Sequence, residues 1–264
     1  MYNKAKAEQY KALVDKVKTE YANNIDEHKD GKINLTGFDE LREVNLYTYW
    51  QGLGYANKTP DIKYLLVGQD WGNPHNEDRD FLQRIHLISA GGVEQYFDGE
   101  ISFDTDKNII ELFSEIDDKY KNIASVRYDE LFFTNFCLGY RTASSSGEMS
   151  KRMMLKDSDR FLELCCILEP EYILCLGKLT FVCVYETLAR KKVTDLIGYT
   201  ENYNDYLDKE KSIAVDYYNV SSRIVPLAHC GAMGTLNRNK GKEKQTDKLY
   251  YQRKDWRKIR KWTE

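Results

Sequence analysis

Three short apolar runs of the chain end at polar side chains of types that serve in catalysis. Gln69 and Asp70 follow the first of these runs, Asn135 lies near the end of the second, and His229 closes another further along the chain. Carboxylates and imidazoles are the common acids and bases of enzymes. An amide side chain offers both a hydrogen-bond donor and an acceptor. If the runs are neighbouring strands, these groups converge on one crevice.

Each of these residues also has an ordinary structural interpretation. An aspartate in a loop is usually a cap, an asparagine at a strand end is usually a turn residue, and a single histidine is usually structural. Their shared placement at the ends of apolar runs is what favours a site.

The apolar runs are expected to be strands of one sheet. They show little alternation, which is typical of strands that are buried on both faces, and they cover 62–68, 130–136, 171–177 and 223–229. Helical patterns separate them, at 106–120, 152–168 and 178–191. This alternation predicts an α/β fold, a three-layer α/β/α sandwich with a central, mainly parallel four-stranded sheet. Ligands bind beyond the carboxyl ends of the strands in such sheets.

The rest of the chain is interpreted as additions to one domain that spans residues 1–264. N-terminal helices are expected within 1–58, at 3–23 and 39–51. The polar, tyrosine-rich stretch 192–222 reads as a rim insertion. A basic C-terminal helix is expected over 246–262, with an apolar side formed by Leu249, Trp256, Ile259 and Trp262.

Composition favours a cytoplasmic protein. No apolar stretch approaches the ~18 residues that a membrane span needs, and the first residues lack the apolar core of a signal peptide. The six cysteines include no C-x-x-C pair, so we expect buried reduced thiols, no metal site and no cofactor. We also favour a monomer that does not bind membranes.

The charge of the chain is uneven. The net charge is −3, but residues 238–261 contain eleven Lys and Arg against three Asp and Glu. Two interpretations stay open for this segment: a solvated basic helix, or a patch that faces phosphate groups.

Four motifs in this order resemble those of the uracil-DNA glycosylase superfamily, over about residues 60–240. Gly68-Gln69-Asp70 matches the start of the family motif G-Q-D-P-Y, and Phe133-Thr134-Asn135 matches a strand motif that ends in asparagine. The stretch LEPEYILCLGK, residues 168–178, is similar to L-x-P-x-x-I-x-x-L-G. His229 falls where the family has H-P-S. The resemblance is that of a divergent member.

The resemblance implies a DNA glycosylase that flips a uracil-type or related damaged or mismatched base and cleaves its N-glycosidic bond with water and no metal. Asp70 would hold the attacking water, and His229 would donate a hydrogen bond to the departing base. Asn135 would read the base edge, and Gln69 would contribute mainly its backbone. The implied base-binding residues are Gly68, Gln69, Asn135, Trp71, Gly72 and the stacking Phe81.

The sequence departs from the family pattern at two places. Trp71 and Gly72 replace proline and tyrosine, which predicts a roomier base pocket unless the indole fills it. Cys230 and Gly231 replace the proline and serine of H-P-S, in a loop that grips phosphate in the family. The residues expected to contact DNA, by a wedge into the duplex or by binding its backbone, are Gly231, Met233, Leu236 and Arg238.

Two other functions fit the same residues. One is a catalytically inactive relative that binds nucleic acid or a partner protein. The other is an enzyme that acts on free nucleosides or nucleotides, which the net charge of −3 suits better than it suits duplex DNA.

Overall fold

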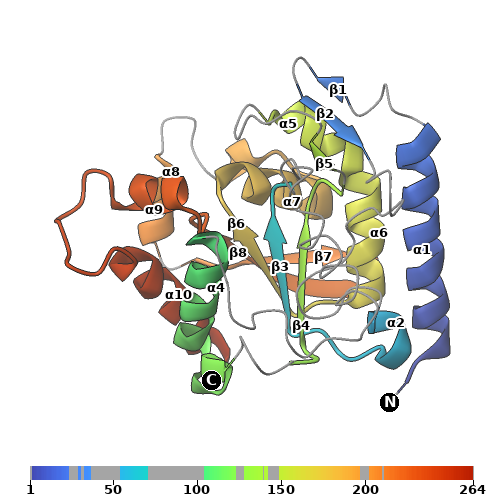
Figure 1. The fold of residues 1–264 in the computed structure, drawn as a ribbon, viewed down its shortest axis with the longest axis horizontal. Helices are drawn as coiled ribbons and strands as arrows, with labels where there is room; N and C mark the ends of the chain where they lie inside the picture. Colours follow the sequence, from blue (N-terminus) through green and yellow to red (C-terminus); the bar gives the residue numbers. More distant parts are fainter. Residues whose placement is uncertain are drawn as a thin grey trace, which may run out of the picture.

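A computed structural model of the chain shows a central sheet with helices on both of its faces (Figure 1). The structure describes residues 2–23, 29–30, 33–36, 54–70, 104–122, 128–138, 140–141, 149–196, 202–209 and 211–263. The five strands of the main sheet lie in the order β4-β3-β6-β8-β7. Their bounds are β3 (Tyr64–Gly68), β4 (Leu131–Asn135), β6 (Tyr172–Leu176), β7 (Ile213–Tyr217) and β8 (Val220–Leu227).

Four of these strands are parallel, and they coincide with the four predicted runs. Tyr64 pairs with Leu131 of β4 on one side and with Tyr172 of β6 on the other, and Arg223 of β8 continues the same row. The prediction of a mainly parallel sheet is therefore confirmed. Its strand count of four is wrong, because β7 adds a fifth strand that runs antiparallel to β8.

β7 lies within residues 192–222, which the sequence predicted to be an insertion on the rim. Its side chains alternate between exposed and buried positions instead of forming a continuous apolar run, which is typical of an edge strand with one solvated face. It turns into β8 through Tyr218, whose φ of 49° places a non-glycine residue in the left-handed region. Residues 213–222 therefore belong to the main sheet.

Alternate side chains of each strand face opposite layers of helices. Leu65 and Val67 of β3 point to the same core as α1 (Lys4–Asn23), α6 (Ser158–Leu168) and α7 (Lys178–Ala189). Tyr64 and Leu66 point to the core under α4 (Asp104–Ile116) and α10 (Tyr250–Thr263). Both faces of the strands are thus covered, as near-continuous apolar runs require.

The helix predictions agree with the structure within a few residues at their ends. Residues 3–23 form α1, 106–120 form α4 with η4 (Asp118–Asn122), and 178–191 form α7. The predicted helix at 152–168 is divided into α5 (Lys151–Met154), η5 (Leu155–Asp157) and α6. The predicted C-terminal helix is α10, with Trp256 and Ile259 fully buried. The helix predicted at 39–51 lies outside the described residues.

The remaining elements are short. They are β1 (Lys29–Asp30), β2 (Ile33–Thr36) and β5 (Tyr140–Arg141) of a small antiparallel sheet, α2 (Tyr55–Lys58), η6 (Val193–Asp195), α8 (Tyr203–Asp208) and α9 (Ala232–Asn239). No helix in the described part of the chain is long and apolar enough to cross a membrane. Among the same residues the cysteines form no disulfide, and five of the six are buried, as expected for reduced thiols.

The order of the strands reverses between β3 and β6. The chain passes from β3 to β4 in one direction, then returns past β3 to form β6 and β8 on its other side. In open α/β sheets ligands bind at this reversal, where the two connections leave the sheet on opposite faces. The residues that follow β3, β4, β6 and β8 are therefore the ones to inspect.

Candidate functional site

The predicted site residues Asp70, Asn135 and His229 all lie at the carboxyl ends of parallel strands. Asn135 is the last residue of β4, and Asp70 and His229 each lie two residues beyond β3 and β8. Asp70 lies close enough to His229 for its carboxylate to act on the pKa of the imidazole. Asn135 pairs in register with Gly68, two residues before Asp70. The structure thus gathers the three groups at one edge of the sheet.

Gly68 makes room for the Asn135 side chain. A Cβ atom at position 68 would lie 2.0 Å from Oδ1 of Asn135, well inside the ordinary contact distance. The amide is therefore packed directly against the backbone of β3, and Asn135 is only 4% exposed. No described residue makes a hydrogen bond with this amide. A buried amide in this state can bind the polar edge of a ligand, because leaving its groups unpaired is costly.

The two strands stay joined beyond their last ladder pair. The Phe136 N–H donates to the Gly68 carbonyl at 2.9 Å, and the Cys137 N–H donates to the Gln69 carbonyl at 3.0 Å. These bonds fix the main chain on which Asp70 is carried. The Gln69 amide also donates from Nε2 to Oδ2 of Asp70 at 2.7 Å. Gln69 therefore orients the carboxylate with its side chain, whereas the sequence predicted mainly a backbone role.

His229 is held as a neutral hydrogen-bond donor. The Gly231 N–H donates to Nδ1 of the imidazole at 2.9 Å, so in the neutral ring the proton lies on Nε2. Burial lowers the pKa of His229 below its usual 6.5, and the nearby Asp70 carboxylate opposes this shift. At neutral pH the half-buried ring is therefore uncharged and offers an Nε2–H donor. No described residue accepts a hydrogen bond from this nitrogen.

The same bond explains Gly231, one of the departures from the family motif. A Cβ atom at this position would lie 3.1 Å from Cε1 and Nδ1 of His229, tighter than ordinary contact. The Gly231 N–H is committed to the imidazole, and the residue is buried. A contact of Gly231 with DNA stays a prediction, and it would have to be made by atoms other than this N–H.

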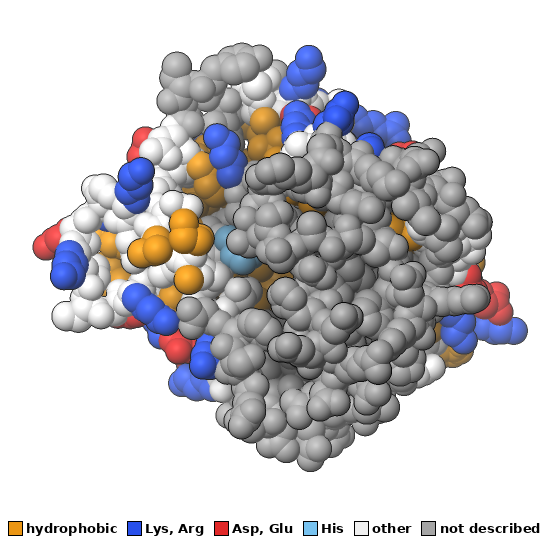
Figure 2. Space-filling view, turned by 45° about the horizontal axis from the view of Figure 1, so that its top comes forward, with side chains coloured by type: hydrophobic (Ala, Val, Ile, Leu, Met, Phe, Trp, Pro, Cys, Tyr) orange, Lys and Arg blue, Asp and Glu red, His pale blue; other side chains and the backbone are white. Residues whose placement is uncertain are grey.

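Helix α9 begins directly after this loop and presents two apolar side chains to solvent. Met233 is 68% exposed and Leu236 is 62% exposed, and their spacing of three residues places them on one face of the helix. Figure 2 shows hydrophobic side chains of the described residues on the same face of the molecule as the histidine. Exposed apolar groups of this size beside a site are suited to contact with a partner. Their role as a wedge stays a prediction.

Arg238 does not fit the role predicted for it. Its side chain is fully buried, where Nε and Nη2 donate to the two carboxylate oxygens of Asp255 at 2.6 and 2.7 Å. Nη2 also donates to Asp208 at 2.7 Å. This bidentate pair ties α9 to α10 and α8, and it leaves no guanidinium surface for a phosphate. The structure therefore does not support a contact between Arg238 and DNA.

The basic segment 238–261 divides into paired and exposed cations. Six of its eleven basic residues pair with carboxylates, two of which, Glu111 and Glu115, lie on α4. The six are Arg238, Lys242, Arg253, Arg257, Lys258 and Arg260. Four lysines are exposed and make no ion pair with a described residue: Lys240, Lys244, Lys248 and Lys254. Three of these lie between α9 and α10. Most of the local charge therefore stabilises the fold, and this connection keeps a basic surface.

Three predicted base-binding residues, Trp71, Gly72 and Phe81, lie outside the described residues. Within the part of the chain that is described, no group of three or more His, Cys, Asp or Glu side chains could hold a metal ion.

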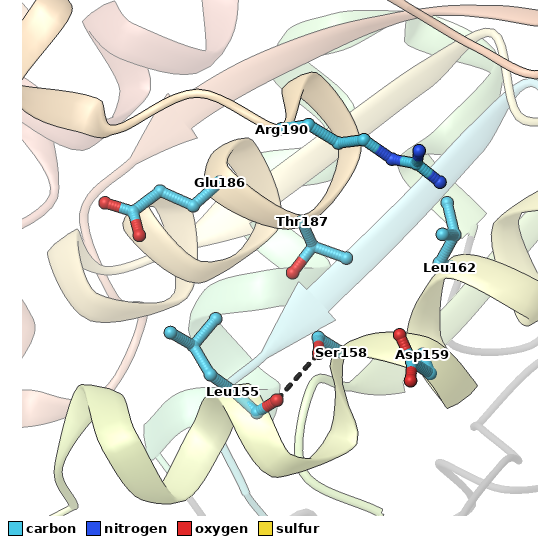
Figure 3. A pocket seen from close by; sticks show the side chains of 7 residues that line it. All are labelled: Leu155, Ser158, Asp159, Leu162, Glu186, Thr187 and Arg190. Atoms are coloured by element: carbon cyan, nitrogen blue, oxygen red, sulfur yellow. Dashed lines mark hydrogen bonds between the residues drawn. The ribbon is translucent and has the colours of Figure 1, made fainter.

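Two pockets elsewhere contain none of the predicted site residues. One, of about 370 Å³, lies between α7 and the α5–η5–α6 segment and is lined by residues such as Leu162 and Thr187 (Figure 3). Two of its three charged side chains are engaged, since Glu186 pairs with Lys151 and Arg190 contacts the Tyr218 hydroxyl, and the third is Asp159. The other, of about 530 Å³, adjoins it along α6. Neither lies at the carboxyl edge of the sheet.

No protein-family model matches this chain, and no curated protein matches it significantly. The functional argument therefore depends on the geometry of the site and on the motifs of the sequence.

Proposed function

We propose that this protein is a divergent relative of the uracil-DNA glycosylases, and that it hydrolyses the N-glycosidic bond of a flipped base in DNA. The observation that carries the proposal is the convergence of Asp70 and His229 at the carboxyl ends of β3 and β8, with Nδ1 of His229 occupied by the Gly231 N–H so that Nε2–H is left for donation. A cationic sugar and an anionic base develop on opposite sides of the breaking bond. A carboxylate and an N–H donor at one edge are suited to stabilise these two charges.

The reaction balances with water as its only co-substrate. The water oxygen forms a bond to the anomeric carbon of the sugar, and the bond from that carbon to the base nitrogen breaks. Asp70, oriented by Gln69, accepts the proton of the water or stabilises the cationic sugar. The base leaves with the electron pair of the broken bond, and His229 stabilises its negative oxygen by a hydrogen bond. Asn135 binds the polar edge of the base.

DNA is the proposed partner because three surface features follow one another along the chain from the end of β8. They are the carboxyl end of the sheet with His229, the exposed apolar face of α9, and the exposed lysines between α9 and α10. Figure 2 shows Lys and Arg side chains on the same face as the histidine. Apolar side chains can fill the gap that a flipped base leaves, and lysines can bind the phosphates on either side. We propose that the protein acts as a monomer in the cytoplasm.

We propose that the base pocket accepts bases larger than uracil as well as uracil itself. Gly72 replaces the family tyrosine that excludes a methyl group, so the pocket has more room unless Trp71 occupies it. A single methyl group changes binding by only ~1–3 kcal/mol in an apolar pocket. A panel of oligonucleotides with uracil, mismatched thymine or 5-hydroxymethyluracil distinguishes these cases, and strict preference for uracil would contradict the roomier pocket.

The central test is an abasic-site cleavage assay on this panel with the wild type and Asp70→Asn. We expect a loss of about 10²–10⁴-fold in the rate of base release, the range for a general base. Asp61→Asn is the matched control, because Asp61 is exposed and lies three residues before β3, near the opposite end of that strand. Unchanged activity of Asp70→Asn would reject the assigned role of this carboxylate. Absence of activity on every substrate would favour an inactive relative that only binds.

A further inference from the structure

The main-chain carbonyl of His229 is held by a buried amide from a distant helix. Nε2 of Gln252, in α10, donates to this carbonyl at 3.0 Å. Gln252 is 1% exposed, and the bond that it makes to the half-buried His229 is itself partly buried. A buried amide without partners costs ~1–3 kcal/mol, which makes its hydrogen bonds selective for one arrangement. None of the motifs in the sequence points to this residue.

Thr235 determines which end of the Gln252 amide faces His229. The Thr235 hydroxyl donates to Oε1 of Gln252 at 2.8 Å, and Thr235 is buried in α9. Because Oε1 is occupied by a donor, the NH₂ end of the amide is directed to the carbonyl of His229. The three groups form a chain of hydrogen bonds from α9 through α10 to the loop at the site.

Two further contacts restrain the same loop. Nδ2 of Asn108, a buried residue of α4, donates to the Cys230 carbonyl at 2.5 Å. Gly234 of α9 packs directly on the His229 backbone, since a Cβ atom there would lie 2.1 Å from the carbonyl oxygen. Residues 229–231 are thus fixed by α4, α9 and α10. This arrangement keeps the Gly231 N–H directed at Nδ1 of the imidazole.

We infer that Gln252 is a positioning residue for His229, which holds the 229–231 loop so that the imidazole proton stays on Nε2. Without the Gln252 amide, the carbonyl of His229 has no hydrogen-bond partner among the described residues, and the peptide that follows is held less firmly. The bond from Gly231 to Nδ1 then weakens, and the proton can move to either nitrogen. The catalytic meaning of this inference rests on the proposed function, but the state of the imidazole can be measured without any activity.

The test is ¹⁵N NMR of the imidazole nitrogens, with the His229 signals assigned by comparison with His229→Gln. In the wild type we expect the signature of one neutral tautomer, with the proton on Nε2. Gln252→Met, which keeps the length of the side chain but has no polar group, is expected to give a mixture of both tautomers. Base release by this variant is expected to fall about 10²-fold, the effect of a misplacement of ~1 Å.

Milder variants keep the test decisive if Gln252→Met does not fold. Thr235→Val removes the hydroxyl that orients Gln252 and keeps the shape, so it should shift the tautomers in the same direction. Thr235→Ser retains the hydroxyl and should restore the wild-type spectrum. Arg253→Gln is the matched control, because Arg253 joins α10 to α4 through Glu111 and Glu115 and does not touch the loop.

The outcomes separate the two proposals. A single Nε2–H tautomer in both folded variants would overturn the role of Gln252, whatever the activity. A tautomer that changes in the variants, in a protein that releases no base from any substrate, would support the role of Gln252 and reject the proposed function. A spectrum disturbed equally by Arg253→Gln would show that general loosening of α10 is the cause, and would also overturn the inference.

Discussion

The close contact between Gly68 and Asn135 allows a sharp test of the site. Gly68→Ala adds one methyl group, whose carbon would lie 2.0 Å from Oδ1 of Asn135. The backbone at position 68 does not have a positive φ, so alanine itself is not strained there. The amide must move by more than 1 Å to reach the ordinary contact distance of 3.4 Å. The variant therefore displaces one proposed base-reading group and leaves the strand in place.

The magnitude follows from that displacement. A shift of ~1 Å in a positioned group can lower a rate by about 10²-fold, which corresponds to ~2.7 kcal/mol of transition-state stabilisation. Adding a methyl group to a packed site costs ~1–3 kcal/mol of folding free energy. Base release measures the first effect and denaturant unfolding measures the second. The second can be measured even in a protein without activity.

A double-mutant cycle with Asn135→Ala provides the control. Asn135→Ala removes the atom that the new methyl group would meet, so Gly68→Ala should cost little in that background. The reasoning is refuted if Gly68→Ala destabilises both backgrounds equally, or if it leaves activity and stability of the wild type unchanged. Equal costs would mean that the methyl group meets something other than the Asn135 amide.

Three further predictions concern residues around the site. Arg238→Met should lower the free energy of unfolding by ~3–5 kcal/mol, because it leaves the buried Asp255 carboxylate without its bidentate partner. A loss of DNA affinity with no change in stability would contradict this role and would favour the predicted contact between Arg238 and DNA. Replacing Lys240, Lys244 and Lys248 by Gln should reduce the slope of log K for DNA binding against log salt concentration by ~0.9 for each phosphate that the variant no longer neutralises. Lys58→Gln is the control, because Lys58 pairs with Asp129 far from this segment in the chain, and it should leave the slope unchanged. The pKa of His229 is lowered in the folded protein, so the stability that its neutral form contributes is present above pH 6.5 and is lost as the pH falls from 6.5 towards the folded pKa. His229→Asn should remove this part of the pH dependence of the free energy of unfolding, which denaturant unfolding at several pH values measures.

The parallel strands and their order along the chain were predictable because each is a continuous apolar run. LLV at 65–67 and ILC at 173–175 have no polar position to face solvent, and burial on both faces is the arrangement that suits them. Edge strand β7 was not predicted, because it has no continuous apolar run. Its sequence IAVDY alternates weakly within a polar stretch, and only pairing with β8 makes it a strand.

The candidate site was predictable where local motifs carry it and unpredictable where distant partners complete it. Asp70, Asn135 and His229 follow recognisable strands, so sheet topology alone brings them to one edge. The support from Gln252 and Asn108 comes from helices that are 23 residues after His229 and 122 residues before Cys230. Arg238 shows the reverse difficulty, because a basic segment in the sequence does not reveal which of its cations are neutralised by buried carboxylates.

The position of Gln252 in the chain has a consequence for how the protein is made. A ribosome synthesises all five strands before it reaches α10, so the nascent chain can complete its sheet while the His229 carbonyl still lacks its partner. Docking of α10 on α4, through Arg253, Arg257 and their carboxylate partners, then becomes the event that completes the site. Newly made molecules would acquire their scaffold first and their chemical competence last.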